Sequence, residues 1–361
     1  MYTKVIRPIL FLFHPDTIHK ICIAVGKRAQ ESRFAKGVAT YLWAPKKDKR
    51  LEVSLWNKTF SHPIGLAAGF DKNGEIIKLL SSVGLGYIEI GAITAKEYKG
   101  NPRPWTTRVP EDNSLIVNYG LKNEGVEKIG KRIEHIPCSI PLIANVAKTN
   151  DKAIQGEVTI EDYIHTIQAI DPYVDIIDIN ISCPNTGDKL LLCEDMNLLE
   201  LLLSRIATVR PTISSSLLLK IKPDISQETI RQIIDLVEKY ACIDGFVATN
   251  LSRNRNLLSR EMEDAPGGIS GKPISNDATR TIKTLYQYTQ GRYPIIGCGG
   301  VFSGEDAYEK IKAGASLIQI LTGFIYKGPG LIKKIHKELL ELLEKDGYNS
   351  IQEAIGVDAK K

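Results

Sequence analysis

The feature that most constrains the fold is a unit that repeats eight times from about residue 60 onward. Each unit has a short, mostly β-branched apolar run, then a junction rich in Gly, Asn or Ser, then a stretch with helical spacing. Continuous apolar runs are typical of parallel strands that are buried on both faces. Eight such units in about 270 residues predict a (β/α)8 TIM barrel, whereas a doubly wound sheet rarely supplies eight successive units without a domain break. The predicted strands are residues 64–68, 86–92, 141–146, 174–182, 216–222, 243–249, 294–298 and 316–321.

The segments around these units have different patterns. Residues 51–60 alternate and turn at Asn57-Lys58, which predicts a β-hairpin at the bottom of the barrel. Residues 97–131 and 252–275 lack a strand pattern, and both follow strand ends where barrel enzymes carry active-site loops. A chain of 361 residues favours one large domain with an appendage. We therefore predict a helical extension over residues 1–45 and a barrel domain over residues 46–361.

The positive charge of the chain is concentrated at its N-terminus. Residues 1–50 hold eleven Lys or Arg against three acids, a net of +8, whereas the other residues hold 36 basic against 39 acidic side chains, a net of −3. Residues 3–13 and 16–30 predict two short helices with apolar stripes beside basic side chains. The pair could simply pack on the barrel, but the basic excess favours helices that lie in an anionic membrane surface.

Cysteine, histidine and hydropathy patterns exclude several classes of protein. The six cysteines are scattered without a CxxC pair, and the six histidines form no HxH or HExxH motif. We therefore expect a reducing compartment and no metal site. No apolar run approaches the roughly 20 residues that span a bilayer, and the run at residues 9–13 stops at His14-Pro15. These patterns predict neither secretion nor a membrane-spanning anchor.

Polar residues at the ends of the predicted strands indicate a binding pocket, because the core of a barrel has no use for them. One amide there could be a structural polar group, but three asparagines and two lysines at one rim are harder to explain in that way. They form a donor-rich pocket that suits a flat, anionic ring bearing carbonyl groups. The residues concerned are Asp71, Lys72, Asn145, Asn180, Ser182, Cys183, Lys220, Thr249 and Asn250.

Glycines in the last two units predict a phosphate site. Gly299 and Gly300 follow the seventh predicted strand, and Thr322 and Gly323 follow the eighth. The loops after strands 7 and 8 of this type of barrel commonly bind phosphate through backbone N–H groups. The loop of residues 267–271 could add further N–H groups. A phosphate-bearing cofactor such as FMN follows.

Cys183 is the predicted proton acceptor. It lies between Ser182 and Pro184 at a strand end, ahead of a loop. A thiol with an ordinary pKa of about 8.5 accepts a proton near neutral pH more readily than a serine hydroxyl does. Most cysteines without such polar neighbours are inert core residues. We assign that role to Cys138, Cys193, Cys242 and Cys298.

Several motifs resemble those of the dihydroorotate dehydrogenase family, and within it the class 2, membrane-associated branch. The resemblance runs from the N-terminal MYTKVIRPILFLFHPDTIHK to the closing AIGVD, with the family motifs in family order. It implies oxidation of dihydroorotate to orotate on bound FMN in pyrimidine synthesis, with a quinone as the final electron acceptor. The motifs are GLAAGFDKNGE, YIEIGAIT, GNPRPWTTRVPED, NISCPNTG, VATN, GGISGKP, PIIGCGG and KIKAGASLIQ.

The resemblance also implies individual roles. Cys183 matches the catalytic base, and His19 and Arg108 match polar residues near a quinone that is held by the N-terminal helices. The positions that match substrate-binding residues are Lys72, Asn118, Asn180, Asn185 and Asn250, with Thr186 and Ser252 flanking them. The positions that match or adjoin FMN-binding residues are Ala68, Ala92, Asn145, Asn180, Lys220, Thr249, Gly271, Gly300, Leu321 and Thr322.

The chain departs from the class 2 pattern at three places. Cys183 stands where class 2 enzymes usually have serine and the soluble class 1 enzymes have cysteine. The segment NYGLKNEG (residues 118–125) is one residue shorter than the usual class 2 segment, which loosens the match of Asn118. The loop TGDKLL (residues 186–191) lacks the usual glycine-leucine-arginine run. These departures concern the pH dependence and, to a lesser degree, the electron acceptor.

Three other functions compete with this interpretation. The first is the same substrate with fumarate or NAD as the acceptor, against which the basic helical extension argues. The second is another FMN barrel such as a tRNA dihydrouridine synthase, whose barrel mouth should be basic, whereas the barrel portion here is net negative. The third is a membrane-binding module on an inactive barrel, which would require a broken pocket. We therefore predict an enzyme on the cytoplasmic face of a bacterial membrane, without a nucleic-acid partner.

Overall fold

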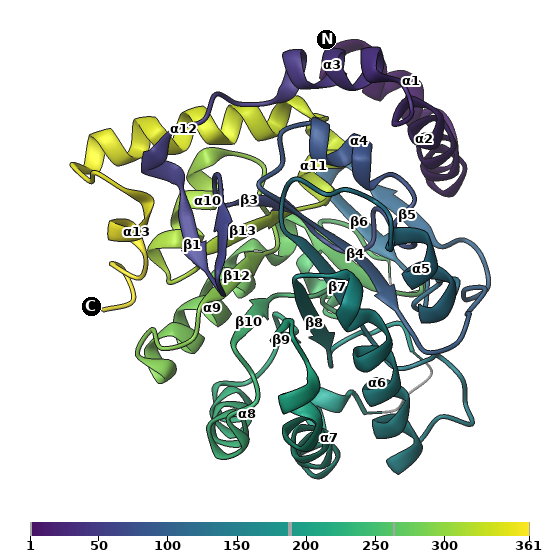
Figure 1. Ribbon diagram of the computed structural model, residues 1–361. Coiled ribbons are helices and arrows are strands. Elements are labelled where there is room, and N and C mark those ends of the chain that lie inside the picture. The colour runs from purple at the N-terminus through teal and green to yellow at the C-terminus, as the bar shows by residue number, and fades with distance from the viewer. Residues whose placement is uncertain (1, 187–189, 263, 361) are drawn as a thin grey trace.

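The computed structural model describes residues 2–186, 190–262 and 264–360, and its centre is a closed barrel of eight parallel strands (Figure 1). Each strand pairs in parallel with the next one around the barrel, and all eight predicted strands are confirmed. The barrel strands are β3 (Ile64–Leu66), β4 (Tyr87–Ile93), β7 (Leu142–Val146), β8 (Ile176–Asn180), β9 (Ser216–Ile221), β10 (Gly245–Ala248), β12 (Ile295–Cys298) and β13 (Leu317–Ile320).

Helices surround the barrel, as the repeating units predict. Figure 1 shows α5 to α9 on the outside of the strands, with α12 across the first and last units. These helices are α4 (Ile77–Ser82), α5 (Val126–Ile133), α6 (Glu157–Ile170), α7 (Met196–Val209), α8 (Gln227–Tyr240), α9 (Ser275–Thr289), α10 (Gly304–Lys312), α11 (Thr322–Lys327), α12 (Gly330–Asp346) and α13 (Ile351–Ala354). Short 3-10 turns lie at Lys49–Leu51, Pro110–Asp112, Asp171–Tyr173, Leu192–Glu194, Arg210–Thr212, Arg255–Leu257 and Lys272–Ile274.

Helix α8 shows how the local sequence sets a helix of this kind. Ser226 caps its start, because its side-chain oxygen accepts a hydrogen bond from the Thr229 backbone N–H. The side chains that face the barrel are Ile230, Ile233, Ile234 and Val237, at the spacing of one helical face. The helix ends where Ala241 adopts a left-handed conformation. The chain can then turn back into strand β10.

A β-hairpin lies at the N-terminal end of the barrel strands, as predicted. Its strands are β1 (Val53–Leu55) and β2 (Lys58–Phe60), which pair antiparallel. The turn residues are Trp56 and Asn57, both with positive φ, so the turn lies one residue earlier than predicted. The Trp56 indole N–H donates to the carbonyl oxygen of Asp244, just before β10, at 3.1 Å. This bond ties the hairpin to the bottom of the barrel.

A second sheet forms at the opposite end of the barrel, where the sequence showed no strand pattern. It contains β5 (Thr106–Val109), β6 (Ser114–Val117) and β11 (Gly268–Gly271), in the antiparallel order β11-β6-β5. The prediction that residues 97–131 and 252–275 contain no strands was therefore wrong. The three strands have only four residues each, and they come from two loops that are far apart in the sequence, so neither loop shows a sustained pattern alone.

The first 45 residues form three helical segments rather than the two predicted. A π-helical turn (Tyr2–Ile6) leads into α1 (Arg7–Phe11), which is followed by α2 (Pro15–Ala29) and the additional helix α3 (Arg33–Trp43). Helix α3 begins at Ser32, whose side chain accepts the Ala35 N–H. Figure 1 places these helices together beside α4 and α11. The division of the chain at residue 45 stays a prediction.

Among the described residues, no single helix is both long and apolar enough to cross a membrane. The segments Tyr2–Phe11 and Pro15–Ala29 meet that requirement only as a pair, with a bend of 117° between them.

Substitution of Phe60 tests whether the hairpin closes the bottom of the barrel. Phe60 is fully buried and its ring meets the Tyr87 ring edge-on at 5.5 Å, whereas Thr59 beside it is exposed. We expect Phe60→Ala to lower the free energy of unfolding by about 3–5 kcal/mol because it leaves a cavity. Thr59→Ala, the matched control, should change it by less than about 0.5 kcal/mol. Chemical denaturation measures both, and equal effects would show that the hairpin does not seal the barrel.

Candidate active site

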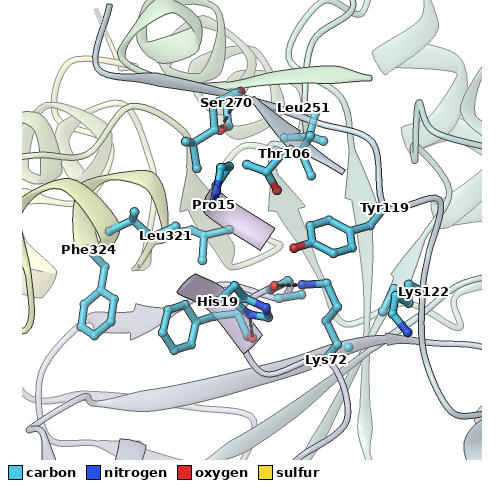
Figure 2. Close-up of a pocket in the computed structure, with 18 of the residues that line it drawn as sticks. Pro15, His19, Lys72, Thr106, Tyr119, Lys122, Leu251, Ser270, Leu321 and Phe324 are labelled. Carbon is cyan, nitrogen blue, oxygen red and sulfur yellow. Dashed lines mark hydrogen bonds between the residues drawn. The ribbon is translucent and has the colours of Figure 1, made fainter. Parts of the chain in front are cut away.

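A cavity of about 380 Å³ extends from the N-terminal helices to the carboxyl ends of the barrel strands. Residues of α1 and α2, among them Leu10, Phe11 and Ile18, line its outer part. Figure 2 shows His19 and Lys72 close together inside it, below Tyr119. Twelve of the predicted site residues line this cavity together: His19, Ala68, Lys72, Ala92, Arg108, Asn145, Asn180, Cys183, Asn185, Lys220, Asn250 and Leu321. Its walls expose mostly apolar side chains, and the amides and Lys220 lie at the inner end.

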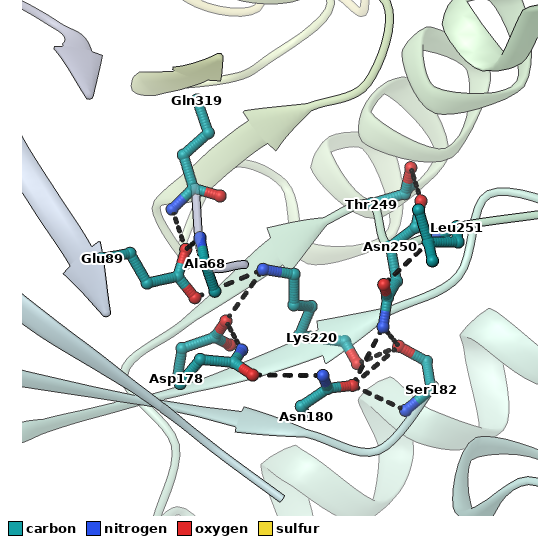
Figure 3. A network of polar contacts seen from close by, with 11 residues as sticks. Ala68, Glu89, Asp178, Asn180, Ser182, Lys220, Thr249, Asn250, Leu251 and Gln319 are labelled. Carbon is teal, nitrogen blue, oxygen red and sulfur yellow. Dashed lines mark hydrogen bonds and ion pairs between the residues drawn. The ribbon is translucent and has the colours of Figure 1, made fainter. Parts of the chain in front are cut away.

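A chain of side-chain amides crosses the barrel mouth (Figure 3). Asn250 donates to Asn180 Oδ1 at 3.0 Å, Asn180 donates to Asn145 Oδ1 at 3.1 Å, and Asn145 donates to Asp178 Oδ2 at 2.6 Å. Successive barrel strands supply these groups, because Asn145 lies on β7 and both Asp178 and Asn180 lie on β8. Each amide orients the next, so the remaining donors and acceptors have fixed directions toward the cavity.

Lys220 lies at the end of this amide chain, between two buried acids. Its Nζ atom is 3.3 Å from Glu89 Oε1 and 3.3 Å from Asp178 Oδ2. The paired carboxyl groups overcome the effect of burial and hold the Lys220 pKa above its ordinary value. The lysine therefore carries a positive charge that faces both the large cavity and a smaller one beside it.

The smaller cavity, of about 70 Å³, is lined by glycines and hydroxyl side chains. It includes Thr249, Gly271, Gly300 and Thr322, all of which the sequence assigned to a phosphate-bearing cofactor. A Cβ atom on Gly300 would lie 2.4 Å from Ser275 Cβ, and the φ of Gly300 is +75°, so only glycine fits there. The Ser270 and Thr322 hydroxyls lie 2.8 Å apart at the same wall. A cradle of this size and polarity suits a phosphate group.

Burial lowers the pKa values of Lys72 and His19, two basic side chains that line the cavity of about 380 Å³. The pKa of Lys72 falls to about 7, although Asp71 opposes the shift. The Lys72 ammonium lies 3.9 Å from the centre of the Tyr119 ring and donates to the Gly69 carbonyl oxygen. Burial lowers the pKa of His19 to about 3, and its Nε2 atom lies 2.7 Å from the Phe70 carbonyl oxygen. His19 is therefore neutral at physiological pH.

Arg108 lies at the outer end of the same cavity, on strand β5. Its guanidinium group donates to the carbonyl oxygens of Phe11 at 3.3 Å and Phe13 at 2.7 Å. It also lies over the Phe11 ring, 4.3 Å from the ring centre. These contacts join the C-terminal end of α1 to the second sheet, which therefore fixes where the helices sit.

Cys183 lies between two cavities. It lines the cavity of about 380 Å³ and also a third, more voluminous one of about 510 Å³, which includes Thr186 and residues of α6. Arg253 donates to the Pro184 carbonyl oxygen, with its Nε atom at 3.1 Å, and so holds the backbone just after Cys183. The departure from the family pattern at 186–191 falls partly on residues 187–189, which lie outside the described part of the chain.

Two predicted substrate residues lie behind the cavity wall rather than on it. Asn118 accepts a hydrogen bond of 2.9 Å from the Asn101 amide, which also donates to the Asn185 carbonyl oxygen at 3.0 Å. Ser252 is fully buried, and its hydroxyl donates to Asp224 Oδ2 at 3.0 Å. Neither Asn118 nor Ser252 is among the residues that line the three cavities. Their contact with the substrate stays a prediction.

Several residues that organise the site were not among those predicted from the sequence. Asn101 links Asn118 and Asn185, and its only signal was its place in the GNPRPW motif. Glu89, Asp178 and Gln319 lie inside strands and point into the barrel mouth. A charged residue within a buried strand was the signal that could have identified Glu89 and Asp178. Within the described ranges, no group of three or more His, Cys, Asp or Glu side chains is placed to bind a metal ion.

A closed parallel barrel with a buried lysine and amides at its mouth, beside a glycine-lined cradle, is typical of barrel enzymes whose loops bind a phosphate group. Comparison with known proteins identifies the family of this enzyme. Residues 50–343 match the family described as dihydroorotate dehydrogenase. The chain therefore belongs to the dihydroorotate dehydrogenase family, which is flavin-dependent.

Named relatives match nearly the whole chain. The dihydroorotate dehydrogenase (quinone) of Halobacterium salinarum is 36% identical, over 98% of this chain and 99% of that protein. The corresponding protein of Christiangramia forsetii is 38% identical, over 94% and 99%. Among solved structures, the Eimeria tenella dihydroorotate dehydrogenase in complex with ferulenol has a TM-score of 0.83 at 28% identity, and 96% of each chain is covered.

The burial of Lys72 predicts the pH at which its side chain loses its positive charge. Because burial lowers its pKa to about 7, Lys72 should be half neutral near pH 7, rather than near pH 10.4 as an exposed lysine is. NMR of the protein with labelled lysine side chains measures the midpoint, and Lys72→Arg assigns the signal. Lys122→Arg, at another lysine of the same cavity, should leave that signal in place. A Lys72 midpoint near 10 would contradict the account of its burial.

Proposed function

We propose that this chain oxidises dihydroorotate to orotate and passes the electrons to a quinone, as a step of pyrimidine biosynthesis. The observation that carries the proposal is a single cavity that joins Cys183, Lys72 and the amide chain to the apolar helices α1 and α2. A relative named dihydroorotate dehydrogenase (quinone) matches 98% of this chain, a share that cannot be reached without most of the helical extension.

The cofactor in this proposal is FMN, and the described residues fit it. FMN, when bound, accepts a hydride from the substrate and gives the electrons to the quinone. The cavity of about 70 Å³ would hold the phosphate, with Gly271, Gly300 and Thr322 around it and Leu321 beside it. The positive charge of Lys220 would stabilise negative charge on a neighbouring ring. The residues that would line the ring and its chain are Ala68, Ala92, Asn145, Asn180, Lys220 and Thr249.

The substrate carboxylate would bind at Lys72. A carboxylate favours the charged form of the lysine, so binding would raise the Lys72 pKa above its value of about 7 in the free site. Affinity for the anion would therefore fall as the pH rises above about 7. The amides of Asn180, Asn185 and Asn250 line the same cavity and would fix the ring. Asn118, Thr186 and Ser252 would support this set from behind.

Cys183 would accept the proton that leaves C5 of dihydroorotate and hold it at Sγ. Its position between the substrate cavity and the cavity of about 510 Å³ gives that proton a route away from the substrate. The bond from Arg253 to the Pro184 carbonyl oxygen would keep the thiol directed at the ring.

We expect Cys183→Ala to slow flavin reduction by dihydroorotate about 10²–10⁴-fold, because the proton acceptor is lost. FMN should remain bound. Cys183→Ser should act only at higher pH, since a hydroxyl loses its proton less readily than a thiol. Anaerobic stopped-flow measurement of flavin absorbance gives these rates, with Cys138→Ala as the control outside the described cavities. Reduction of Cys183→Ala at the unaltered rate would exclude Cys183 as the base.

The quinone would enter between α1 and α2. His19 is neutral and lies within an apolar lining, which suits an uncharged ring that needs one polar contact. Arg108 would place its positive charge at the outer part of the same route. The two ligands would thus approach the flavin through different parts of one cavity.

The three N-terminal helices would hold the enzyme on an anionic membrane surface, on the cytoplasmic face of a bacterial cell membrane. Large apolar side chains on all three are exposed: Val5, Ile6, Ile9, Leu12, Phe13, Ile21, Val25, Phe34, Val38, Tyr41 and Leu42. Phe34 and Tyr41 of α3 are 82% and 84% exposed, far more than a side chain packed on the barrel would be. The net charge of +8 over residues 1–50 complements anionic lipid.

Vesicle binding tests the membrane surface. We expect Phe34→Ser with Tyr41→Ser to weaken sedimentation with anionic phosphatidylglycerol vesicles by about tenfold or more, because each side chain buries apolar area in the lipid. Tyr288→Ser, an exposed aromatic position on α9, is the matched control and should leave binding unchanged. Binding that survives the double substitution would place the contact on a surface other than α3.

A further inference from the structure

Lys220 has two acidic neighbours, Glu89 and Asp178, that have no role in the proposed function. Glu89 and Asp178 are both fully buried, and each lies 3.3 Å from the same ammonium group. One lysine can neutralise only one carboxylate. Burial of a second, unpaired negative charge would cost several kcal/mol. The site must therefore hold a proton as well as the lysine.

The hydrogen bonds identify Glu89 as the ionised member of the pair. Its Oε2 atom accepts the Ala68 backbone N–H at 3.2 Å and the amide of Gln319, while its Oε1 atom faces Lys220 (Figure 3). All three partners are donors, which favours a carboxylate. Burial opposes ionisation, but the Lys220 charge, the Asp178 side chain and the Ala68 N–H together hold the Glu89 pKa below its ordinary value.

Asp178 has the opposite surroundings. Its Oδ2 atom takes the contacts from Asn145 and Lys220, and its Oδ1 atom has no partner among the hydrogen bonds of the described residues. The Asp178 and Glu89 carboxyl groups also lie next to each other beside the same ammonium group, and two neighbouring carboxyl groups can share a hydrogen bond only when one is protonated. Burial first, and the charge of Glu89 second among the raising effects, hold the Asp178 pKa well above its ordinary value.

The other titratable groups around the pair remain neutral. Tyr87 lies on β4 with Glu89, and burial raises its pKa well above the ordinary value. Cys298 lies at the end of β12, and burial raises its pKa to about 11. The neighbouring groups on β7 and β13, Asn145 and Gln319, do not titrate. The charge of this buried cluster is therefore set by Lys220, Glu89 and Asp178.

We propose that Asp178 is a positioning residue that holds one proton in a hydrogen bond with Glu89 and thereby fixes the charge that Lys220 presents to the flavin. With Asp178 neutral, the cluster of three has no net charge, and the ammonium of Lys220 faces the flavin site. With Asp178 ionised, the cluster would be negative and would oppose reduction of the flavin. This inference rests on the flavin site of the proposed function.

Infrared spectroscopy detects the proton directly and does not depend on dihydroorotate. The protein should show the C=O stretch of a buried, protonated carboxyl group that disappears in Asp178→Asn. Asp171→Asn is the matched control, because Asp171 accepts N–H groups of Ser214 and Ser215 that hold its pKa below the ordinary value. The band should persist in that variant. Absence of this infrared band from the unaltered protein would overturn the proposal.

Electrochemical titration of the bound flavin tests the consequence. Asp178→Asn replaces one neutral group with another, and in Glu89→Gln the Asp178 proton can leave, so Asp178 becomes the counter-ion of Lys220. Each single variant should therefore change the reduced-to-oxidised ratio at a fixed reference potential by less than about threefold. Glu89→Gln combined with Asp178→Asn leaves Lys220 unpaired and should raise that ratio by about tenfold or more.

Ionisation of both acids would give a different pattern of reduced-to-oxidised flavin ratios. If both acids were ionised, Asp178→Asn alone would raise the ratio by about tenfold or more, and the effects of the two substitutions would add. That outcome would overturn the proposal. Because the flavin is reduced electrochemically, a wrong substrate assignment leaves this test intact. A protein that binds no flavin would contradict the proposed function, and the infrared band would still decide the protonation of Asp178.

Discussion

The ammonium group of Lys220 is buried at the mouth of the barrel, and much of the site follows from what that charge requires. A buried cation is stable only with opposite charge and oriented dipoles around it. Four barrel strands meet this need: β4 supplies Glu89, β7 supplies Asn145, β8 supplies Asp178 and β13 supplies Gln319. The amides that satisfy these acids continue to Asn180 and Asn250. One electrostatic constraint thus orients the cofactor side and the substrate side together.

The sequence predicted the barrel because each strand is a continuous apolar run whose pattern is local. It predicted Lys72, Asn145, Cys183 and Lys220 at the rim because polar residues at strand ends have few structural uses. It could not predict strands β5, β6 and β11, since four-residue strands from distant loops reveal themselves only when they pair. Helix α3 was also missed, although Phe34, Val38 and Tyr41 lie at helical spacing after the N-cap Ser32, and this pattern could have identified it.

Glu89 and Asp178 were missed for a different reason. Each is a single acid inside an otherwise apolar strand, so the strand pattern gives it no role. Their shared contact with Lys220 exists only in the folded barrel, where β4 and β8 both face that lysine. Asn118 was predicted to contact the substrate, but the structure does not place it on the cavity wall. Its residue type fitted a substrate contact, yet it lies one hydrogen bond behind the cavity wall, next to Asn101. Residue type can be predicted from sequence more readily than the direction in which a side chain points.

The central claim is that dihydroorotate reduces this protein and a quinone reoxidises it. The most direct measurement is anaerobic turnover of dihydroorotate in mild detergent, with ubiquinone or menaquinone analogues, fumarate and NAD offered as separate acceptors. The account predicts rapid turnover with a quinone and none with fumarate or NAD. Turnover with fumarate or NAD alone would contradict the role given to the N-terminal helices, and a flavin that dihydroorotate does not bleach would contradict the substrate.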